Sequence, residues 1–213
     1  EIAQSEAATG EEFARHWLHV GLLAMDGEKM SSSIGNFWTV SDALDELGVN
    51  VIRTFYASAA YRSEQALTEE TIAEAKERWD RFSRSYERAV DALDSVDARS
   101  KATDETLRRA VADREGFKAA MNDDLNLREA TAALLELTDA VNRHVDAGPP
   151  HDYRGLHDAV TAFEELGGDV LGLQFGAATD GDVGLAGELV ELVLDIREAE
   201  RAAGNYERAD ELR

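Results

Sequence analysis

Apolar residues beyond about residue 66 recur every three or four positions, which is the period of an amphipathic helix. The clearest stripe predicts a long helix from Thr68 to Leu93, with Thr68 capping an acidic first turn. Its apolar residues are Ile72, Ala75, Trp79, Phe82, Tyr86, Ala89 and Leu93. The helical spacing of Trp79, Phe82 and Tyr86 indicates core residues rather than platforms for stacking RNA bases.

Further stripes predict more helices after the first. One pattern runs from Leu107 to Met121 and ends at "NDDLN", and Asn126 with Glu129 forms a start like a capping box for the next. Gly148-Pro149-Pro150 ends that helix. The later segments are a helix over 153–166, a glycine-rich loop over 172–184, a helix over 185–196, and a last helix after Gly204-Asn205. Because each stripe needs an apolar partner, we expect an antiparallel helix bundle.

The first third of the chain has a different pattern. Residues around Leu22–Met25 alternate as in a strand, and Asp26-Gly27 predicts a turn, which together indicate a short strand or hairpin that leads into a serine-rich loop. "SDALDELG" and "NVIRTFYASAA" predict two short helices, with Ser41 and Asn50 near their starts. The predicted fold class is therefore mainly α, with a short β/loop module followed by the helix bundle.

The amino-acid composition excludes several kinds of chemistry for this chain. The 213 residues contain no cysteine, which excludes disulfides and thiolate chemistry within the chain, and no apolar run of about 18 residues that could span a bilayer. We expect a soluble, cytoplasmic protein that has no membrane partner. The formal net charge of −22 indicates a solvated acidic surface, which suits concentrated salt because the Debye length falls to about 3 Å at 1 M.

The loop "GEKMSSSIGNF", residues 27–37, combines one lysine with three serines and a glycine. Phosphate chemistry favours a long cation beside backbone amides and hydroxyls, because these groups hold polyphosphate charge as it shifts. Lys29 supplies the cation, and Ser31, Ser32 and Ser33 supply the hydroxyls. On composition alone, a plain linker is the alternative.

This loop resembles the K-M-S-K-S signature of class I aminoacyl-tRNA synthetases. "EIAQSEAATG", "WLHVG", "SIGNF", "YRS" and "NDDLN" follow in the order found in the cysteinyl-tRNA synthetase family. Beyond residue 130, the resemblance rests on helical character and on the final "GNYERADELR". The chain is thus identified as similar to the carboxy-terminal portion of that family, from a salt-adapted organism.

The resemblance implies roles for the loop. Lys29, Ser31 and Ser33 would lie at the phosphates of ATP, which acts with Mg²⁺ when cysteine is activated. Ser32 stands where the family has the second lysine of the signature, so Lys29, a backbone amide or a bound cation would have to replace that group.

The resemblance also implies two further site residues. Glu1 aligns with a glutamate that helps to hold zinc, but the histidine and cysteine ligands are not in this chain, so we expect Glu1 to be an exposed residue and the fragment not to retain zinc. His19 aligns with the histidine-lined floor of the active site, where it would contact substrate; the alternative is a packed core histidine beside Trp17 and Val20.

The family's domains imply three parts in this chain. Residues 1–22 would end the catalytic domain, 23–66 would form the signature-loop module, and 67–213 would form a helical bundle of the anticodon-binding type. Without the amino-terminal catalytic half, the fragment is expected to be inactive alone. The leading hypothesis is a portion of a cysteine–tRNA ligase whose partner is tRNA(Cys). The alternatives are a non-catalytic tRNA-binding scaffold and a related ligase that joins cysteine to an amino-sugar.

Individual tRNA contacts do not follow from the sequence. Arg53, Arg62, Arg81 and Arg84 are candidates for phosphate contact, but such arginines more often lie on solvated helix faces, paired with acids one turn away.

Overall fold

The computed structural model describes residues 1–25, 28–29 and 38–176. The chain divides into two compact units, residues 1–175 and 176–213, and the first contains the elements described below. They include seven α-helices, one π-helix and three short strands, which confirms the predicted mainly α class. Among the described residues, no helix is both long and apolar enough to cross a bilayer.

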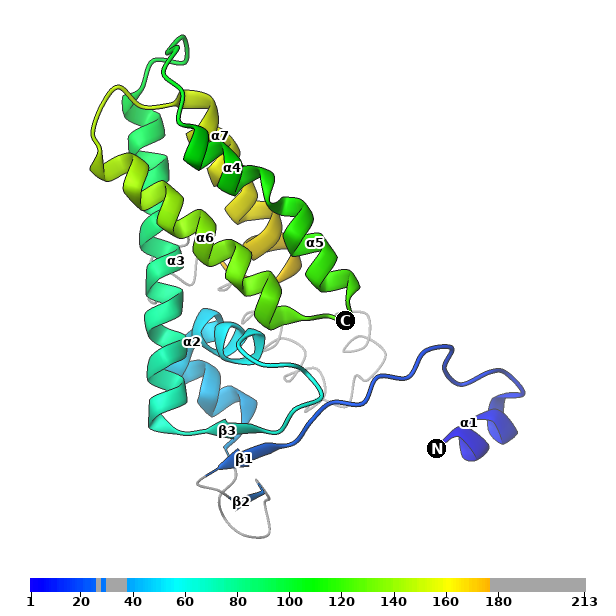
Figure 1. The fold of residues 1–213 in the computed structure, drawn as a ribbon. Helices are drawn as coiled ribbons and strands as arrows, with labels where there is room; N and C mark the ends of the chain where they lie inside the picture. The colour runs from blue at the N-terminus through cyan, green and yellow to red at the C-terminus, as the bar shows by residue number, and fades with distance from the viewer. Residues whose placement is uncertain (26–27, 30–37, 177–213) are drawn as a thin grey trace, which may run out of the picture. The chain divides into compact units, whose positions relative to one another are not determined.

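Four helical segments form the bundle. They are α3 (Glu69–Ser95), the pair α4 (Glu105–Ala112) and α5 (Arg114–Asn122), α6 (Leu127–Asp146), and α7 (Tyr153–Ala162) with its continuation η1 (Phe163–Val170). Successive segments run in alternating directions, as Figure 1 shows. The bundle is thus antiparallel, as the apolar stripes predict.

The bundle core comes from the predicted stripes. Phe82 is 1% exposed, and Trp79 and Tyr86 are partly buried against the same cluster, which confirms all three as core residues. Full burial of a side chain of this size contributes about 1.5–3 kcal/mol. Leu107, Leu134, Val141, Leu156 and Phe163 are fully buried with Phe82.

The helix starts agree with their predicted caps in two cases. The Thr68 hydroxyl accepts a hydrogen bond from the Thr71 amide, and Glu69 and Glu70 occupy the first turn. Asn126 accepts from the Glu129 amide at 3.2 Å and donates to its carboxylate at 3.2 Å. Both caps satisfy amides that a helix start would otherwise leave unpaired.

Two predicted helices are divided in the structure. The pattern from Leu107 to Met121 breaks at Asp113, between α4 and α5, and the helix over 153–166 changes from α to π at Phe163. Both segments keep their apolar face towards the core through the break, which is why spacing alone predicts one helix in each place. The helices expected over 185–196 and after Gly204-Asn205 lie outside the described residues.

α1 (Ile2–Thr9) is a short helix without buried residues. α2 (Val40–Ala57) contains both short helices expected there, joined at Gly48, whose φ of 75° and ψ of 156° form a kink. Such a conformation is essentially restricted to glycine. Ser41 lies near the start of α2, as expected, and the helix is capped by Thr39, whose hydroxyl accepts from the Asp42 amide at 3.0 Å.

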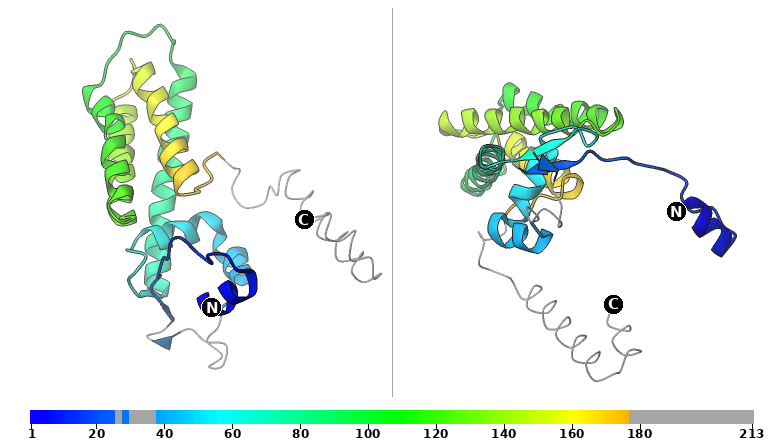
Figure 2. Two further views of the ribbon diagram at one scale, coloured as in Figure 1. Left: turned by 90° about the vertical axis from the view of Figure 1, so that its right-hand side faces the viewer. Right: turned by 90° about the horizontal axis from the view of Figure 1, so that it is seen from below.

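The sheet has three short strands in the order β2-β1-β3. β1 (Leu23–Met25) pairs with β2 (Glu28–Lys29) in an antiparallel hairpin, as predicted, and with β3 (Gln65–Leu67) in parallel. α2 packs against the first half of α3, next to this sheet (Figure 1 and Figure 2). A second apolar cluster of Val51, Phe55, Leu67 and Ala75 fills that space, and Trp79 contacts both clusters.

Candidate functional site

Lys29, the lysine of the signature loop, is the last residue of the β1–β2 hairpin. In the β1–β2 pairing, Lys29 lies opposite Ala24 and Glu28 lies opposite Met25. This pairing fixes the backbone of Lys29 at the last position of β2, and Met30 separates it from the three serines. Ser31, Ser32 and Ser33 lie outside the described residues, so their predicted roles stay predictions.

β1 is held from its start by the loop at "YRS". The Gly21 amide donates to the Tyr61 carbonyl at 2.7 Å, and the Gln65 amide donates to the Leu22 carbonyl at 3.0 Å. A Cβ atom at Gly21 would lie 2.0 Å from the carbonyl oxygen of Ser63. Only glycine permits this approach, so the glycine of "WLHVG" allows that segment to meet "YRS".

The same loop meets the turn that contains "NDDLN". Asp124 accepts from the Tyr61 hydroxyl at 2.8 Å and from Arg62 Nη2 at 3.2 Å. The guanidinium carbon of Arg62 lies 5.2 Å from the centroid of the Tyr61 ring. The hydrogen bond to Asp124 is the main cause that raises the pKa of Tyr61, because ionised tyrosine cannot donate it.

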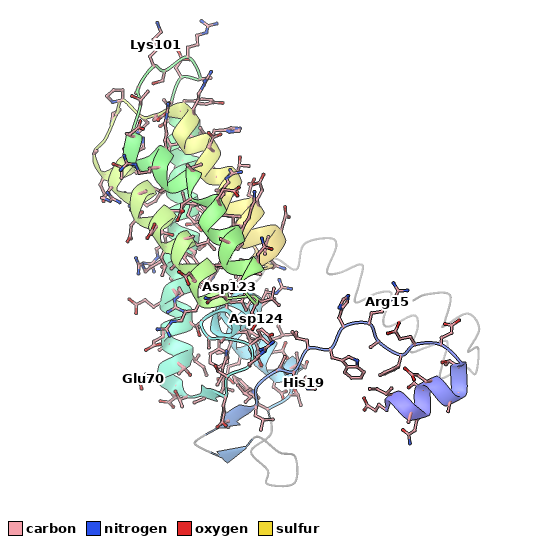
Figure 3. All side chains as sticks on the ribbon, turned by 45° about the vertical axis from the view of Figure 1, so that its right-hand side comes forward. Arg15, His19, Glu70, Lys101, Asp123 and Asp124 are labelled. Atoms are coloured by element: carbon pink, nitrogen blue, oxygen red, sulfur yellow. The ribbon has the colours of Figure 1, made fainter. Side chains whose placement is uncertain are left out.

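Three segments far apart in the sequence thus meet at the base of the hairpin. Figure 3 shows Asp123 and Asp124 at the turn between α5 and α6, and His19 on the segment before β1. We call the contacts among Gly21, Tyr61, Arg62, Ser63 and Asp124 the hairpin junction. The sequence contains all three segments as separate motifs, but no spacing rule predicts that they touch.

His19 is not a packed core side chain. It is exposed, and its neighbours Trp17 and Val20 are 50% and 68% exposed. The packed alternative is therefore wrong, because residues 15–20 lie outside both apolar clusters. A substrate-binding role for His19 stays a prediction.

Glu1 is exposed at the start of α1, where its carbonyl accepts from the Ser5 amide at 2.9 Å. Within residues 1–25, 28–29 and 38–176, no three His, Cys, Asp or Glu side chains gather as a metal site would require. One exposed carboxylate does not fit the zinc site that the family resemblance implies.

Three of the four candidate arginines reach partners far along the chain. Arg53 donates to the Gly172 carbonyl, Arg62 to Asp124 and Arg81 to Asp139 at 3.0 Å, whereas Arg84 has its nearest acid, Asp80, at 3.7 Å. The expected pairing within one helix is therefore wrong for the first three. These contacts connect α2, the loop at "YRS" and α3 to other parts of the fold.

A buried polar network lies at the other end of the bundle. Asp152 is 1% exposed and accepts two hydrogen bonds from Arg108, at 2.7 and 3.0 Å. The amides of Asp104 and Gly155 also donate to it. Burial alone would raise the pKa of Asp152, but the hydrogen bonds from Arg108 and the two amides outweigh it and lower the pKa to about 2.

His144 connects this network to α6. Its Nε2 accepts from the Asp152 amide at 3.2 Å, so Nδ1 carries the proton and donates to Asp104 at 2.8 Å. All polar atoms named here have partners inside the protein. The network is consequently a structural connection between α4, α6 and α7, and no periodic pattern of residues predicts it.

Two sequence families match the chain. Residues 1–77 match the family described as tRNA synthetases class I (C) catalytic domain, and residues 116–176 match the DALR domain. The first contains the hairpin and its junction segments at 21 and 61–63, and the second contains Asp124.

Curated relatives align over the whole chain. Proteins named cysteine–tRNA ligase are 63% identical in Haloarcula marismortui, 62% in Halobacterium salinarum and 39% in Deinococcus radiodurans. The chain spans 44%, 44% and 43% of their lengths, respectively.

The fold also has a solved counterpart. A crystal structure of the ternary complex of Agrobacterium radiobacter K84 agnB2 LeuRS with tRNA and LeuAMS superposes with a TM-score of 0.56. The match covers 70% of this chain and 20% of that chain at 17% identity, so it supports the fold alone. With two domain families in order and 63% identity along its whole length, the chain belongs to the cysteine–tRNA ligase family of class I synthetases.

Proposed function

We propose that this chain is the carboxy-terminal portion of a cysteine–tRNA ligase. The complete enzyme would join cysteine to ATP, release pyrophosphate, and transfer the cysteinyl group to the 3′ end of tRNA(Cys) in the cytoplasm. The observation that carries the proposal is that Lys29, the first residue of the K-M-S-K-S-like motif, ends a strand paired with β1, within residues 1–77 that match the class I catalytic domain.

In this proposal, Lys29 contacts the phosphates of ATP. Developing charge on the phosphates favours a preorganised cation, and removing one such donor costs about 10²–10³ in rate. β2 ends at Lys29, so the sheet fixes the position of the Lys29 backbone. Ser31, Ser32 and Ser33 would add hydroxyl donors around the same phosphates, together with the Mg²⁺ that accompanies ATP.

In this proposal His19 contacts substrate, whereas Glu1 has no assigned role. His19 is exposed on the segment that leads into β1, which suits contact with a substrate held by another part of the enzyme. Glu1 does not fit a zinc site with the residues described here, so no step of the proposed reaction is assigned to zinc on this chain.

The helix bundle would bind tRNA. The match of residues 116–176 to the DALR domain supports this role and disfavours the ligase that joins cysteine to an amino-sugar, which needs no tRNA-binding bundle. A non-catalytic scaffold would bind tRNA equally well, so only activation of cysteine distinguishes it from the enzyme.

Filter binding of a tRNA(Cys) transcript to this chain tests the bundle's role. Because the net charge of −22 repels phosphates until salt screens it, we expect weak binding in dilute buffer and stronger binding in molar KCl. Unstructured RNA of the same length is the control. If the chain were indifferent to tRNA at both salt concentrations, the tRNA-binding proposal would fail.

A further inference from the structure

The turn between α5 and α6 has an unusual backbone. Asp124 and Leu125 both have a φ of 55°, in the left-handed region, which aspartate tolerates better than leucine. Hydrogen bonds from the Leu125 amide to Met121 at 3.2 Å and from the Asn126 amide to Ala120 at 3.0 Å close the turn. Backbone strain of this kind is retained where the surrounding structure fixes it, often at functional positions.

This turn presents the Asp124 carboxylate to the loop at 61–63. Tyr61 connects the turn to Gly21, because its hydroxyl donates to Asp124 and its carbonyl accepts from the Gly21 amide. Arg62 adds the second hydrogen bond to Asp124 and lies over the Tyr61 ring. One side chain of the bundle therefore fixes the loop that holds the start of β1.

From Gly21, the chain enters the hairpin after one residue. β1 starts at Leu23, and its Ala24 pairs with Lys29. We infer that Asp124 is a positioning residue, which acts through Tyr61 and Gly21 to set the place of the hairpin that carries Lys29. The inference rests on the proposed function of Lys29 and extends it to a residue of the bundle, in the turn between α5 and α6.

The effect should be modest. The side chains of Arg62 and Asp124 are 66% and 58% exposed, and exposed ion pairs of this kind contribute little. We therefore expect changes of about two- to fivefold, rather than the 10²-fold or larger loss expected for a group that touches the reacting phosphates.

Three variants distinguish the loss of the Asp124–Tyr61 hydrogen bond from a change in the backbone of the turn. Asp124→Gly keeps a residue that accepts a positive φ but removes the carboxylate, Tyr61→Phe removes the hydroxyl alone, and Asp124→Asn keeps an acceptor oxygen. Glu115→Gln on α5 is the matched control, because Glu115 forms an exposed ion pair with Lys118 at 2.9 Å.

Hydrogen exchange on this chain tests the first half of the inference. We expect Asp124→Gly and Tyr61→Phe to speed exchange of the Gly21 and Gln65 amides two- to fivefold, with no change in the amides of α3. Asp124→Asn should have a smaller effect, and Glu115→Gln none. The two larger effects should not add in the double variant, because both remove the same contact. Unchanged exchange in Asp124→Gly would overturn the inference.

Kinetics of the complete polypeptide that contains this chain test the second half. Asp124→Gly and Tyr61→Phe should lower kcat for cysteine-dependent pyrophosphate exchange two- to fivefold, while KM for tRNA in aminoacylation stays unchanged. Faster amide exchange with an unchanged kcat would overturn the positioning role and leave a purely structural contact. An inactive parent protein would instead overturn the proposed function, and the amide-exchange result would still decide whether Asp124 holds Gly21.

Discussion

Asp152 connects three helices through hydrogen bonds. It is buried at the start of α7 and accepts hydrogen bonds from Arg108 on α4 and from the backbone amide of Asp104 before α4. His144 on α6 accepts from the Asp152 amide. The carboxylate can stay charged in this buried place because four hydrogen bonds compensate for lost water.

The lowered pKa of Asp152 predicts acid sensitivity. In the folded protein its pKa is about 2, below the ordinary value of 3.8, so the unfolded chain takes up a proton first as pH falls. The stabilisation, about 2 kcal/mol, should be present above pH of about 4 and disappear between about 4 and 2. Urea unfolding across this range measures it.

Asp152→Asn supplies the comparison for that titration. It keeps the shape of the side chain but takes up no proton between pH of about 4 and 2, so its stability should fall less steeply over the same pH range, from a lower starting value. Glu115→Gln, on an exposed helix face, should follow the parent curve. Equal slopes for Asp152→Asn and the parent chain would contradict the assigned role of Asp152.

At the scale of elements, the apolar periodicity of the sequence predicts α3 and α6 well, because a long amphipathic stripe and a cap reinforce each other. It fails where a local break leaves the stripe intact, as at Asp113 and Phe163. β3 is missed because three residues carry too little alternation to be recognised, and its parallel pairing with β1 depends on a connection of 39 residues between Met25 and Gln65.

The candidate site is predictable to a similar extent. The signature residues Lys29 to Ser33 are recognisable as a motif, and the hairpin before them follows from the Asp26-Gly27 turn. The hairpin junction is not predictable, because hydrogen bonds between residues 40 to 63 positions apart leave no periodic trace.

Gly21→Ala tests the close approach at the junction. The added Cβ would lie 2.0 Å from the Ser63 carbonyl oxygen, so the two segments must separate, at a cost of about 1–3 kcal/mol in unfolding free energy. Denaturant unfolding gives this value. Gly168→Ala is the control, because its Cβ would meet only the Leu173 carbonyl, at an ordinary 3.6 Å. Equal stability of the two variants would show that Gly21 is not closely packed.

At the scale of the whole molecule, two features bear on the proposed function: the net charge and the connection of the hairpin to the bundle. The net charge of −22 and the relatives in Haloarcula and Halobacterium favour work in concentrated salt, where repulsion between the protein and phosphates is screened. Under those conditions, short-range contacts between the protein and the phosphates determine how tightly they bind. Lys29 ends β2, whose backbone is connected to the bundle through the sheet and the hairpin junction, and it is the central residue of the proposed chemistry.

The direct test is cysteine-dependent exchange of pyrophosphate into ATP by the complete polypeptide in molar KCl, measured for Lys29→Ala. We predict a fall in rate of about 10²-fold or more, because a donor to the phosphates is lost. Lys118→Ala, which removes an exposed lysine of α5, should keep the parent rate. If Lys29→Ala exchanged pyrophosphate as fast as the parent protein, the assignment of the hairpin to ATP would be wrong.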